Sequence, residues 1–346
     1  MQILIKKWLL LIAVCIITAC RKDKPEDVLT PSINTAANGV YVTNEGNFQF
    51  GNAQVSYYDP SSNNCVQDLF EPANNRPLGD VCQSMYTFNG KVYMVVNNSG
   101  KIEVVNESNF SSVATITGLT SPRYFLPVSN SKAYVSDLYA NHISIIDLSN
   151  NTIGNSIACN GQTEEMILAY GKVFITNYLS DKLYVINTLT DVLTDSITIG
   201  FGSNSIVEDK NGKIWVLCSG SASNAVKASL HRINPVNNLV EQSFTFLNST
   251  ETPWRLNMNA GNDTLYYLNN DLYRMSITAS SLPPTPFISH GTRNFYGLGI
   301  DPSSNEIYVS DAIDYVQRGK IYRYDAAGTQ LNTFLAGIIP GDFYFK

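Results

Sequence analysis

The stretch Tyr41-Val42-Thr43-Asn44 recurs along the chain and decides the fold. Each copy begins with an aromatic residue, and consecutive copies are spaced by 52, 41, 40, 41, 51 and 42 residues. The seven copies begin at Tyr41, Tyr93, Tyr134, Phe174, Trp215, Tyr266 and Tyr308. A second β-rich run follows each copy, the first being Val55-Ser56-Tyr57-Tyr58-Asp59. A period near 40 residues made of short β-rich runs is typical of propeller blades, so the sequence predicts an all-β, seven-bladed β-propeller.

Each repeat predicts strands B, C and D in chain order, followed by a run that fits the innermost strand A of the next blade. No strand A can precede Val40, because residues 28–38 resemble a linker. At the other end, residues 337–345 have the character of a strand A with no strand B after it. We therefore expect the C-terminal strand to close blade 1, whose outer strands lie in residues 40–70, and to remove the two free edges of the ring.

Short polar residues end most of the predicted C strands, where their side chains can cap the following turn. This structural role explains their recurrence better than catalysis does. The residues are Asp59, Asn106, Asp147, Asn187, Asn234 and Asp325.

The N-terminus reads as a processing signal. Lys6-Lys7 precedes an apolar run from Trp8 to Ile17, and Ile17-Thr18-Ala19-Cys20 is similar to a bacterial lipobox. We expect a signal peptide at 1–19, a lipidated Cys20 with a flexible tether at 20–38, and the propeller at 39–346. The alternative is an ordinary secretory signal. No run of 18 apolar residues follows residue 20, so the expected membrane attachment is through lipid alone.

Charge and cysteine content limit the possible partners. The chain has 23 Lys and Arg against 29 Asp and Glu, and loss of residues 1–19 removes two lysines, leaving 21 against 29. Such a balance argues against nucleic-acid binding, which needs a basic surface. Cys65, Cys82, Cys159 and Cys218 follow no metal-binding spacing. Free thiols are the favoured interpretation, with a disulfide left open.

The predicted B-to-C loops vary in length on one face of the propeller. Blades 2, 3 and 4 have five residues there and blade 6 has two, whereas blades 1, 5 and 7 have ten, eleven and nine. Insertions confined to one face usually mark a binding face. The B-to-C loops and the D-to-A junctions of that face supply the ligand-binding candidates Asn47, Phe48, Phe50, Arg123, Tyr124, Tyr139, Tyr178, Asn204, Trp254, Arg255, Arg293, Asn294, Tyr296, Asp342 and Phe343.

These residue types suit a flat polar ligand, because aromatic rings stack while amides and guanidiniums donate directional hydrogen bonds. The alternative for each aromatic is packing between blades. Evidence for catalysis is thin: the chain has three histidines, and no nucleophile, metal, phosphate-loop or dinucleotide motif. Glu164 and Glu165 are adjacent, and strand alternation predicts that they point to opposite faces. We expect a binding protein with no resident cofactor rather than an enzyme.

The repeat resembles that of the YVTN-type, YncE-like seven-bladed propellers over residues 39–346. More narrowly, Val42 to Phe48 and Asn52 to Asp59 resemble the first blade of BtuG-type surface lipoproteins of Bacteroidetes. This resemblance implies capture of cobalamin as a bound ligand and its transfer to a TonB-dependent outer-membrane transporter. The charged segment Arg21 to Asp27 is similar to the signal that sends such lipoproteins to the outer face of the outer membrane. The alternatives are a propeller enzyme, either a lyase or a quinoprotein-like dehydrogenase, and an adhesin that binds protein or glycan.

Overall fold

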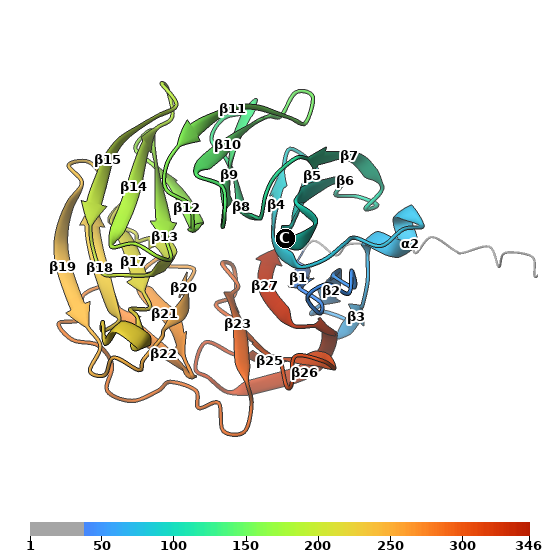
Figure 1. Cartoon of the computed structure of the whole chain (residues 1–346). Coiled ribbons are helices and arrows are strands. Elements are labelled where there is room, and N and C mark those ends of the chain that lie inside the picture. Colours follow the sequence, from blue (N-terminus) through green and yellow to red (C-terminus); the bar gives the residue numbers. More distant parts are fainter. Residues whose placement is uncertain (1–37) are drawn as a thin grey trace, which may run out of the picture. The chain divides into compact units, whose positions relative to one another are not determined.

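The computed structural model describes residues 38–346, and in this part of the chain seven antiparallel sheets follow one another around a ring (Figure 1). The predicted signal peptide, Cys20 and nearly all of the predicted tether lie outside the described residues. Each sheet corresponds to one copy of the repeat, so the prediction of an all-β, seven-bladed propeller is confirmed.

The strands fall into the four predicted classes. For blades 1 to 7 in turn, the A strands are β27 (Pro340–Phe345), β4 (Cys82–Phe88), β8 (Pro122–Pro127), β12 (Thr163–Ala169), β16 (Ser203–Glu208), β20 (Trp254–Met258) and β23 (Phe295–Ile300). The B strands are β1 (Val40–Asn44), β5 (Lys91–Val96), β9 (Lys132–Asp137), β13 (Lys172–Asn177), β17 (Ile214–Cys218), β21 (Thr264–Asn269) and β24 (Ile307–Asp311).

The C strands are β2 (Gln54–Asp59), β6 (Lys101–Asn106), β10 (His142–Asp147), β14 (Lys182–Asn187), β18 (Ser229–Asn234), β22 (Asp271–Ser276) and β25 (Arg318–Tyr324). The D strands are β3 (Asn64–Val66), β7 (Ser112–Thr117), β11 (Thr152–Ala158), β15 (Val192–Thr198), β19 (Leu239–Thr245) and β26 (Gln330–Ile338). Three short helices complete the described part: α2 (Phe70–Asn74), η1 (Asn97–Ser99) and η2 (Ala222–Asn224).

The recurring aromatic residue of the motif packs between blades. All seven of these residues are buried, because each B strand has neighbours on both sides and on both faces. Tyr93, for example, stacks on Phe125 of the next blade with the ring centroids 4.4 Å apart. The core is therefore a series of blade-to-blade clusters, and the repeat is a packing signal.

The C-terminal strand closes the ring as predicted. Strand β27 pairs antiparallel with β1, with Phe343 opposite Val42 and Tyr344 opposite Tyr41 (Figure 1). The resulting sheet has the order β27-β1-β2-β3, so strands from both ends of the propeller form blade 1. This pairing covers the inner edge of β1.

Blade 6 departs from the predicted pattern. Its sheet contains only β20, β21 and β22, and the expected fourth strand is not formed in the described chain. The segment after β22 contains Pro283, Pro284 and Pro286, which have no N–H group to donate to a sheet. One isolated bridge, Leu272 to Ile288, remains on the outer side of β22.

Most of the polar residues at the ends of the C strands cap the following turn as predicted. A side-chain oxygen of each of five of them accepts the N–H of the residue two positions further on: Asp59, Asp147, Asn187, Asn234 and Asp325. Asn106 differs, because its side-chain N–H group donates to the hydroxyl of Ser111. Structural capping therefore accounts for these residues.

The four cysteines of residues 38–346 are free thiols, in agreement with the favoured interpretation. Cys82, Cys159 and Cys218 are buried, while Cys65 is partly exposed. No helix in the same residues is both long and apolar enough to cross a membrane.

Candidate ligand-binding site

A β-bulge near the start of the inner strands builds the site. In β8, the register shifts so that Arg123 and Tyr124 together lie opposite the single residue Ser136. A bulge interrupts the alternation of side chains and redirects them. The same register shift occurs in β4, β12, β16, β20, β23 and β27, so every blade has one at the same end of its inner strand.

The bulges surround a cavity of about 480 Å³ on the face that carries the B-to-C loops. Eight of the predicted candidates line it, and they come from six blades: Phe48, Arg123, Tyr124, Tyr178, Asn204, Trp254, Arg255 and Tyr296. The rings of Phe48, Tyr178 and Trp254 are 61%, 46% and 37% exposed. The predicted face therefore contains a cavity, and aromatic side chains reach solvent around it.

Three further candidates, Asn47 and Phe50 in the long loop of blade 1 and Tyr139 in the short loop of blade 3, do not line this cavity. The Nδ2 group of Asn47 donates to the carbonyl of Tyr315 at 2.6 Å and so joins the long loops of blades 1 and 7. Phe50 and Tyr139 are 77% and 66% exposed.

The remaining four candidates have structural contacts. The guanidinium of Arg293 lies over the rings of Phe295 and Tyr322, with Cζ at 4.8 and 4.9 Å from the ring centroids. The backbone N–H of Asn294 donates to the carboxylate of Asp311 at 2.9 Å. Phe343 is buried against Tyr308 between blades 7 and 1. Asp342 lies further along the inner strands, in the wall of a second cavity of about 260 Å³.

Sequence reasoning missed several residues of the cavity wall. Glu45, Gly46, Val81, Gln83, Asn97 and Ile339 line the cavity but were not among the candidates. Blade spacing could have identified Gln83, because it precedes Tyr93 by ten residues, as Tyr124 precedes Tyr134. Val81 and Ile339 carried no such signal, since apolar residues at a loop entrance read as packing.

The two adjacent glutamates show how the bulge overrides strand alternation. We expected Glu164 and Glu165 to point to opposite faces, but Thr163 pairs with Asn177 and Met166 with Ile175, which leaves both glutamates opposite Thr176. Both line the cavity. The expectation was wrong because strict alternation holds only in a regular strand.

Hydrogen bonds hold some of the charged groups in place. The Nε group of Arg123 donates to both carboxylate oxygens of Glu164 at 3.1 and 2.9 Å, and its Nη1 group donates to Gln83. The hydroxyl of Tyr296 donates to Glu45 at 2.8 Å. Arg123 and Glu164 thus form a hydrogen-bonded ion pair within the cavity wall.

Burial changes the protonation of two other carboxyl groups. Desolvation, followed by the charge of Asp342, raises the pKa of Glu165 to about 8, although the backbone N–H of Ile206 donates to it at 3.1 Å. Desolvation also raises the pKa of Glu45. At neutral pH, Glu165 is therefore mostly protonated.

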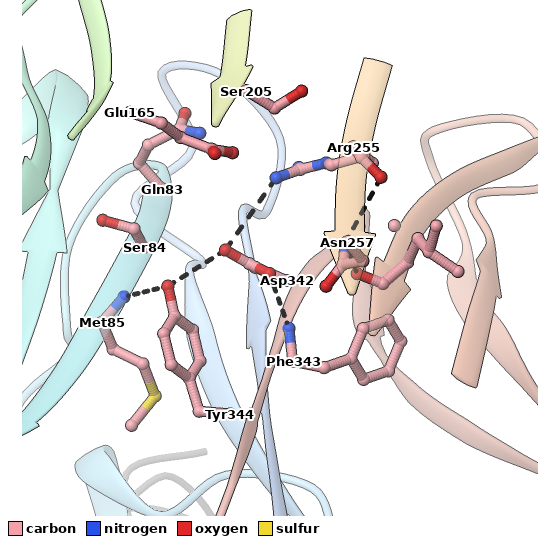
Figure 2. Close-up of polar contacts among 12 residues, drawn as sticks. Gln83, Ser84, Met85, Glu165, Ser205, Arg255, Asn257, Asp342, Phe343 and Tyr344 are labelled. Carbon is pink, nitrogen blue, oxygen red and sulfur yellow. Dashed lines mark hydrogen bonds and ion pairs between the residues drawn. The ribbon is translucent and has the colours of Figure 1, made fainter. Parts of the chain in front are cut away.

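A chain of polar contacts links the cavity to the closing strand (Figure 2). Arg255 Nη1 lies 3.9 Å from Asp342 Oδ2, and the same oxygen accepts the Tyr344 hydroxyl at 3.0 Å. The Tyr344 oxygen in turn accepts the backbone N–H of Met85 at 2.9 Å. The closing strand therefore contributes polar groups to the centre of the propeller.

The arrangement favours binding of a polar ligand by aromatic and hydrogen-bonding groups. In residues 38–346 no three His, Cys, Asp or Glu side chains are grouped so as to hold a metal ion. His231 is buried, which lowers its pKa to about 4, and the His290 ring contacts the carbonyl of Arg293. Neither of these histidines lines the cavity.

Comparison with known families gives a match that covers most of the chain. Residues 38–337 match the family described as a domain of unknown function, DUF5074, and the chain belongs to this family. The comparison with curated proteins gave no match.

Solved structures with the same fold come from several bacteria. A quinonprotein alcohol dehydrogenase-like protein from Bacteroides thetaiotaomicron is 16% identical, with a TM-score of 0.71, covering 89% of this chain and 78% of that chain. A functionally unknown protein from Desulfotomaculum acetoxidans is 12% identical, with a TM-score of 0.63, covering 90% of this chain and 99% of that chain. At these identities the likeness concerns the fold.

Proposed function

We propose that this protein captures a small polar ligand at its loop face and releases it without chemical change. The observation that carries the proposal is the convergence of side chains from all seven blades on one cavity. A ring of aromatics, guanidiniums, amides and carboxyl groups offers both stacking area and directional hydrogen bonds. Preorganised groups of this kind bind a ligand with little loss of side-chain freedom.

Cobalamin is the first ligand to test. Phe48, Tyr178 and Trp254 are partly exposed at the cavity, so a ligand larger than the cavity can still contact them. Titration of the protein with cyanocobalamin, followed by calorimetry, should give saturable binding with one site per chain. The variant Trp254→Ala should weaken this binding about fivefold, because stacking on an indole contributes on the order of 1 kcal/mol. Absence of heat or of any saturable signal would reject cobalamin as the ligand.

The proposal also includes the cellular setting. Cys20 carries the lipid, the propeller faces the outside of the outer membrane, and a TonB-dependent transporter receives the ligand. Cell fractionation and protease treatment of intact cells test this setting. Cys20→Ala should move the protein from the membrane to the soluble fraction, and intact cells should lose the wild-type protein to added protease. Protection of the wild-type protein in intact cells would argue for a periplasmic orientation.

An enzyme is the second candidate, and Glu165 is the observation that favours it. A carboxyl group with a pKa of about 8 close to Arg255 suits general acid or base chemistry near neutral pH. Turnover of a substrate that Glu165→Gln abolishes would support this candidate. His290→Ala serves as the matched control, because His290 lies outside the cavity wall and its loss should leave turnover unchanged.

A further inference from the structure

The guanidinium of Arg255 lies in the cavity wall with its N–H donors open to the cavity. Its side chain is only 13% exposed, yet among residues 38–346 it makes no hydrogen bond. Its one ion pair, with Asp342, is long at 3.9 Å, and its Cζ atom lies 5.9 Å from the ring centroid of Tyr296. A buried group with five N–H donors normally has acceptors, so these donors are available to a bound molecule.

The second arginine of the wall provides a comparison within the same molecule. Arg123 lies in the equivalent region of blade 3, but Glu164 and Gln83 accept hydrogen bonds from its guanidinium. The Nε and Nη1 groups of Arg123 therefore have partners within the protein, whereas no nitrogen of the Arg255 guanidinium donates a hydrogen bond to residues 38–346. The two side chains are chemically identical but differ in the hydrogen bonds that they donate within the protein.

The backbone of Arg255 is also unusual. Its φ angle is +57°, in the left-handed region that residues other than glycine rarely adopt. The residue lies in the bulge of β20, between the paired residues Trp254 and Asn257. Backbone strain of this kind persists where the surrounding structure enforces it, and it often marks a ligand site. Two independent features therefore single out Arg255.

The charges around Arg255 indicate which acceptor it would take. Asp342, Glu45 and Glu165 all lie close enough to influence its ionisation or to be influenced by it. In Figure 2 the side chains of Glu165 and Asp342 point toward the guanidinium of Arg255. A carboxylate on the ligand would place a further negative charge beside Asp342 and would favour deprotonation of no neighbouring group, whereas a neutral amide adds no charge.

We propose that Arg255 anchors the ligand by donating its guanidinium fork to the carbonyl oxygen of a carboxamide group. This inference rests on the proposed function, capture of a small ligand at this face. The neutral carboxyl group of Glu165 also lines the cavity and within residues 38–346 receives only one hydrogen bond, from the N–H of Ile206, so it keeps lone pairs that can accept an amide N–H group. A carboxamide thus satisfies a buried donor and gives its own N–H groups a partner.

The test uses nicotinamide and nicotinate, two probes of one shape that differ in the amide and the carboxylate. Calorimetry or ligand-observed NMR at millimolar concentration should show wild-type protein binding nicotinamide at least tenfold more tightly than nicotinate. Arg255→Lys keeps the positive charge but lacks the planar fork, so it should weaken nicotinamide binding at least tenfold. Arg323→Lys is the matched control, because Arg323 is similarly buried, lies outside the cavity wall and donates to Glu306 at 2.7 Å. It should change nicotinamide binding less than threefold.

Thermal denaturation without ligand supplies an independent readout. Arg255→Lys removes no hydrogen bond and should leave Tm unchanged, whereas Arg123→Lys disrupts the contacts with Glu164 and Gln83 and should lower Tm. If Arg255→Lys does not fold, Arg255→Gln replaces it, with the same expected loss of nicotinamide binding.

Three results would overturn the proposal: tighter binding of nicotinate, unchanged nicotinamide binding in the Arg255 variants, or no binding of nicotinamide to the wild-type protein. The cyanocobalamin titration separates this proposal from the proposed function. Cobalamin binding that survives Arg255→Lys would reject Arg255 as the anchor and retain ligand capture. Nicotinamide binding without cobalamin binding would retain Arg255 as the anchor and reject cobalamin as the ligand.

Discussion

Two β-branched residues of the cavity wall have left-handed backbones. Val81 has a φ angle of +62° and Ile339 one of +52°, and the carbonyl of each accepts the first N–H of a B-to-C loop. Gly202 does the same in blade 5 with a φ angle of +76°. The position therefore suits glycine, and a β-branched side chain there is strained by roughly 1–2 kcal/mol. Both residues line the cavity.

Replacing Val81 with glycine tests whether the left-handed backbone at this position is strained. Relief of backbone strain should offset the lost contacts, so we expect the free energy of unfolding to change by less than about 1 kcal/mol. Val92→Gly, at a fully buried strand position, is the matched control and should lose about 3 kcal/mol. Chemical denaturation measures both. A loss from Val81→Gly as large as that of the control would refute strain at Val81.

Glu165 should make the stability of the protein depend on pH. Its pKa is about 8 in the folded protein and ordinarily 4.5, with Asp342, Arg255 and Glu164 as charged neighbours. Between these values the unfolded chain releases a proton that the folded protein keeps. The free energy of unfolding should therefore fall as the pH rises from about 4.5 to about 8, and level off above that.

Glu165→Gln should make this decline shallower, because glutamine stays neutral and can still accept the N–H of Ile206. Urea denaturation at pH 5, 7 and 9 gives the difference between the wild type and the variant. Other carboxyl groups with raised pKa values, such as Glu45 and Asp342, contribute equally to both proteins. Identical pH profiles for the two proteins would contradict the assignment.

Among the elements, β27 closes the ring by supplying the inner strand of blade 1. Phe343 of this strand is buried in the cluster shared by blades 7 and 1. Phe343→Ala should lower the free energy of unfolding by about 3–5 kcal/mol, the usual effect of removing a buried phenylalanine. Phe48→Ala, at a ring that is 61% exposed, should change it by less than about 0.5 kcal/mol. Equal losses would show that β27 does not stabilise the ring through this cluster.

At the scale of the whole molecule, blade 6 breaks the regularity of the ring. Strand β22 has β21 on one side and only the bridge from Leu272 to Ile288 on the other. Its amide hydrogens should exchange with solvent faster than those of β14 and β18, which have a strand on both sides. Hydrogen exchange with mass spectrometry measures the difference. Equal protection of the three strands would mean that the proline-containing segment after β22 shields it as well as a strand does.

The architecture was predictable because the repeat has a direct physical cause. An aromatic residue at Tyr93 or Trp215 is needed wherever neighbouring blades pack, so it recurs at the blade spacing. Half of the residues that line the cavity were predicted for a related reason, since variable loops and blade junctions lie on one face of any propeller. The missing strand of blade 6 was not predicted, because a strand D was expected in every repeat although Pro283, Pro284 and Pro286 have no N–H group to donate to a sheet.

The seven blades, the closure by the C-terminal strand and the face that carries the long loops could be predicted from the repeat alone. Which side chains share the cavity depended on the tertiary structure. The bulges place Glu164 and Glu165 on the same side, and they bring an Arg123 that donates to Glu164 and an Arg255 that donates no side-chain hydrogen bond within residues 38–346 to the wall of one cavity. Periodic packing is a local property that recurs in the sequence. Register shifts and hydrogen-bond partners depend on strands that are distant in the chain, and no local pattern records them.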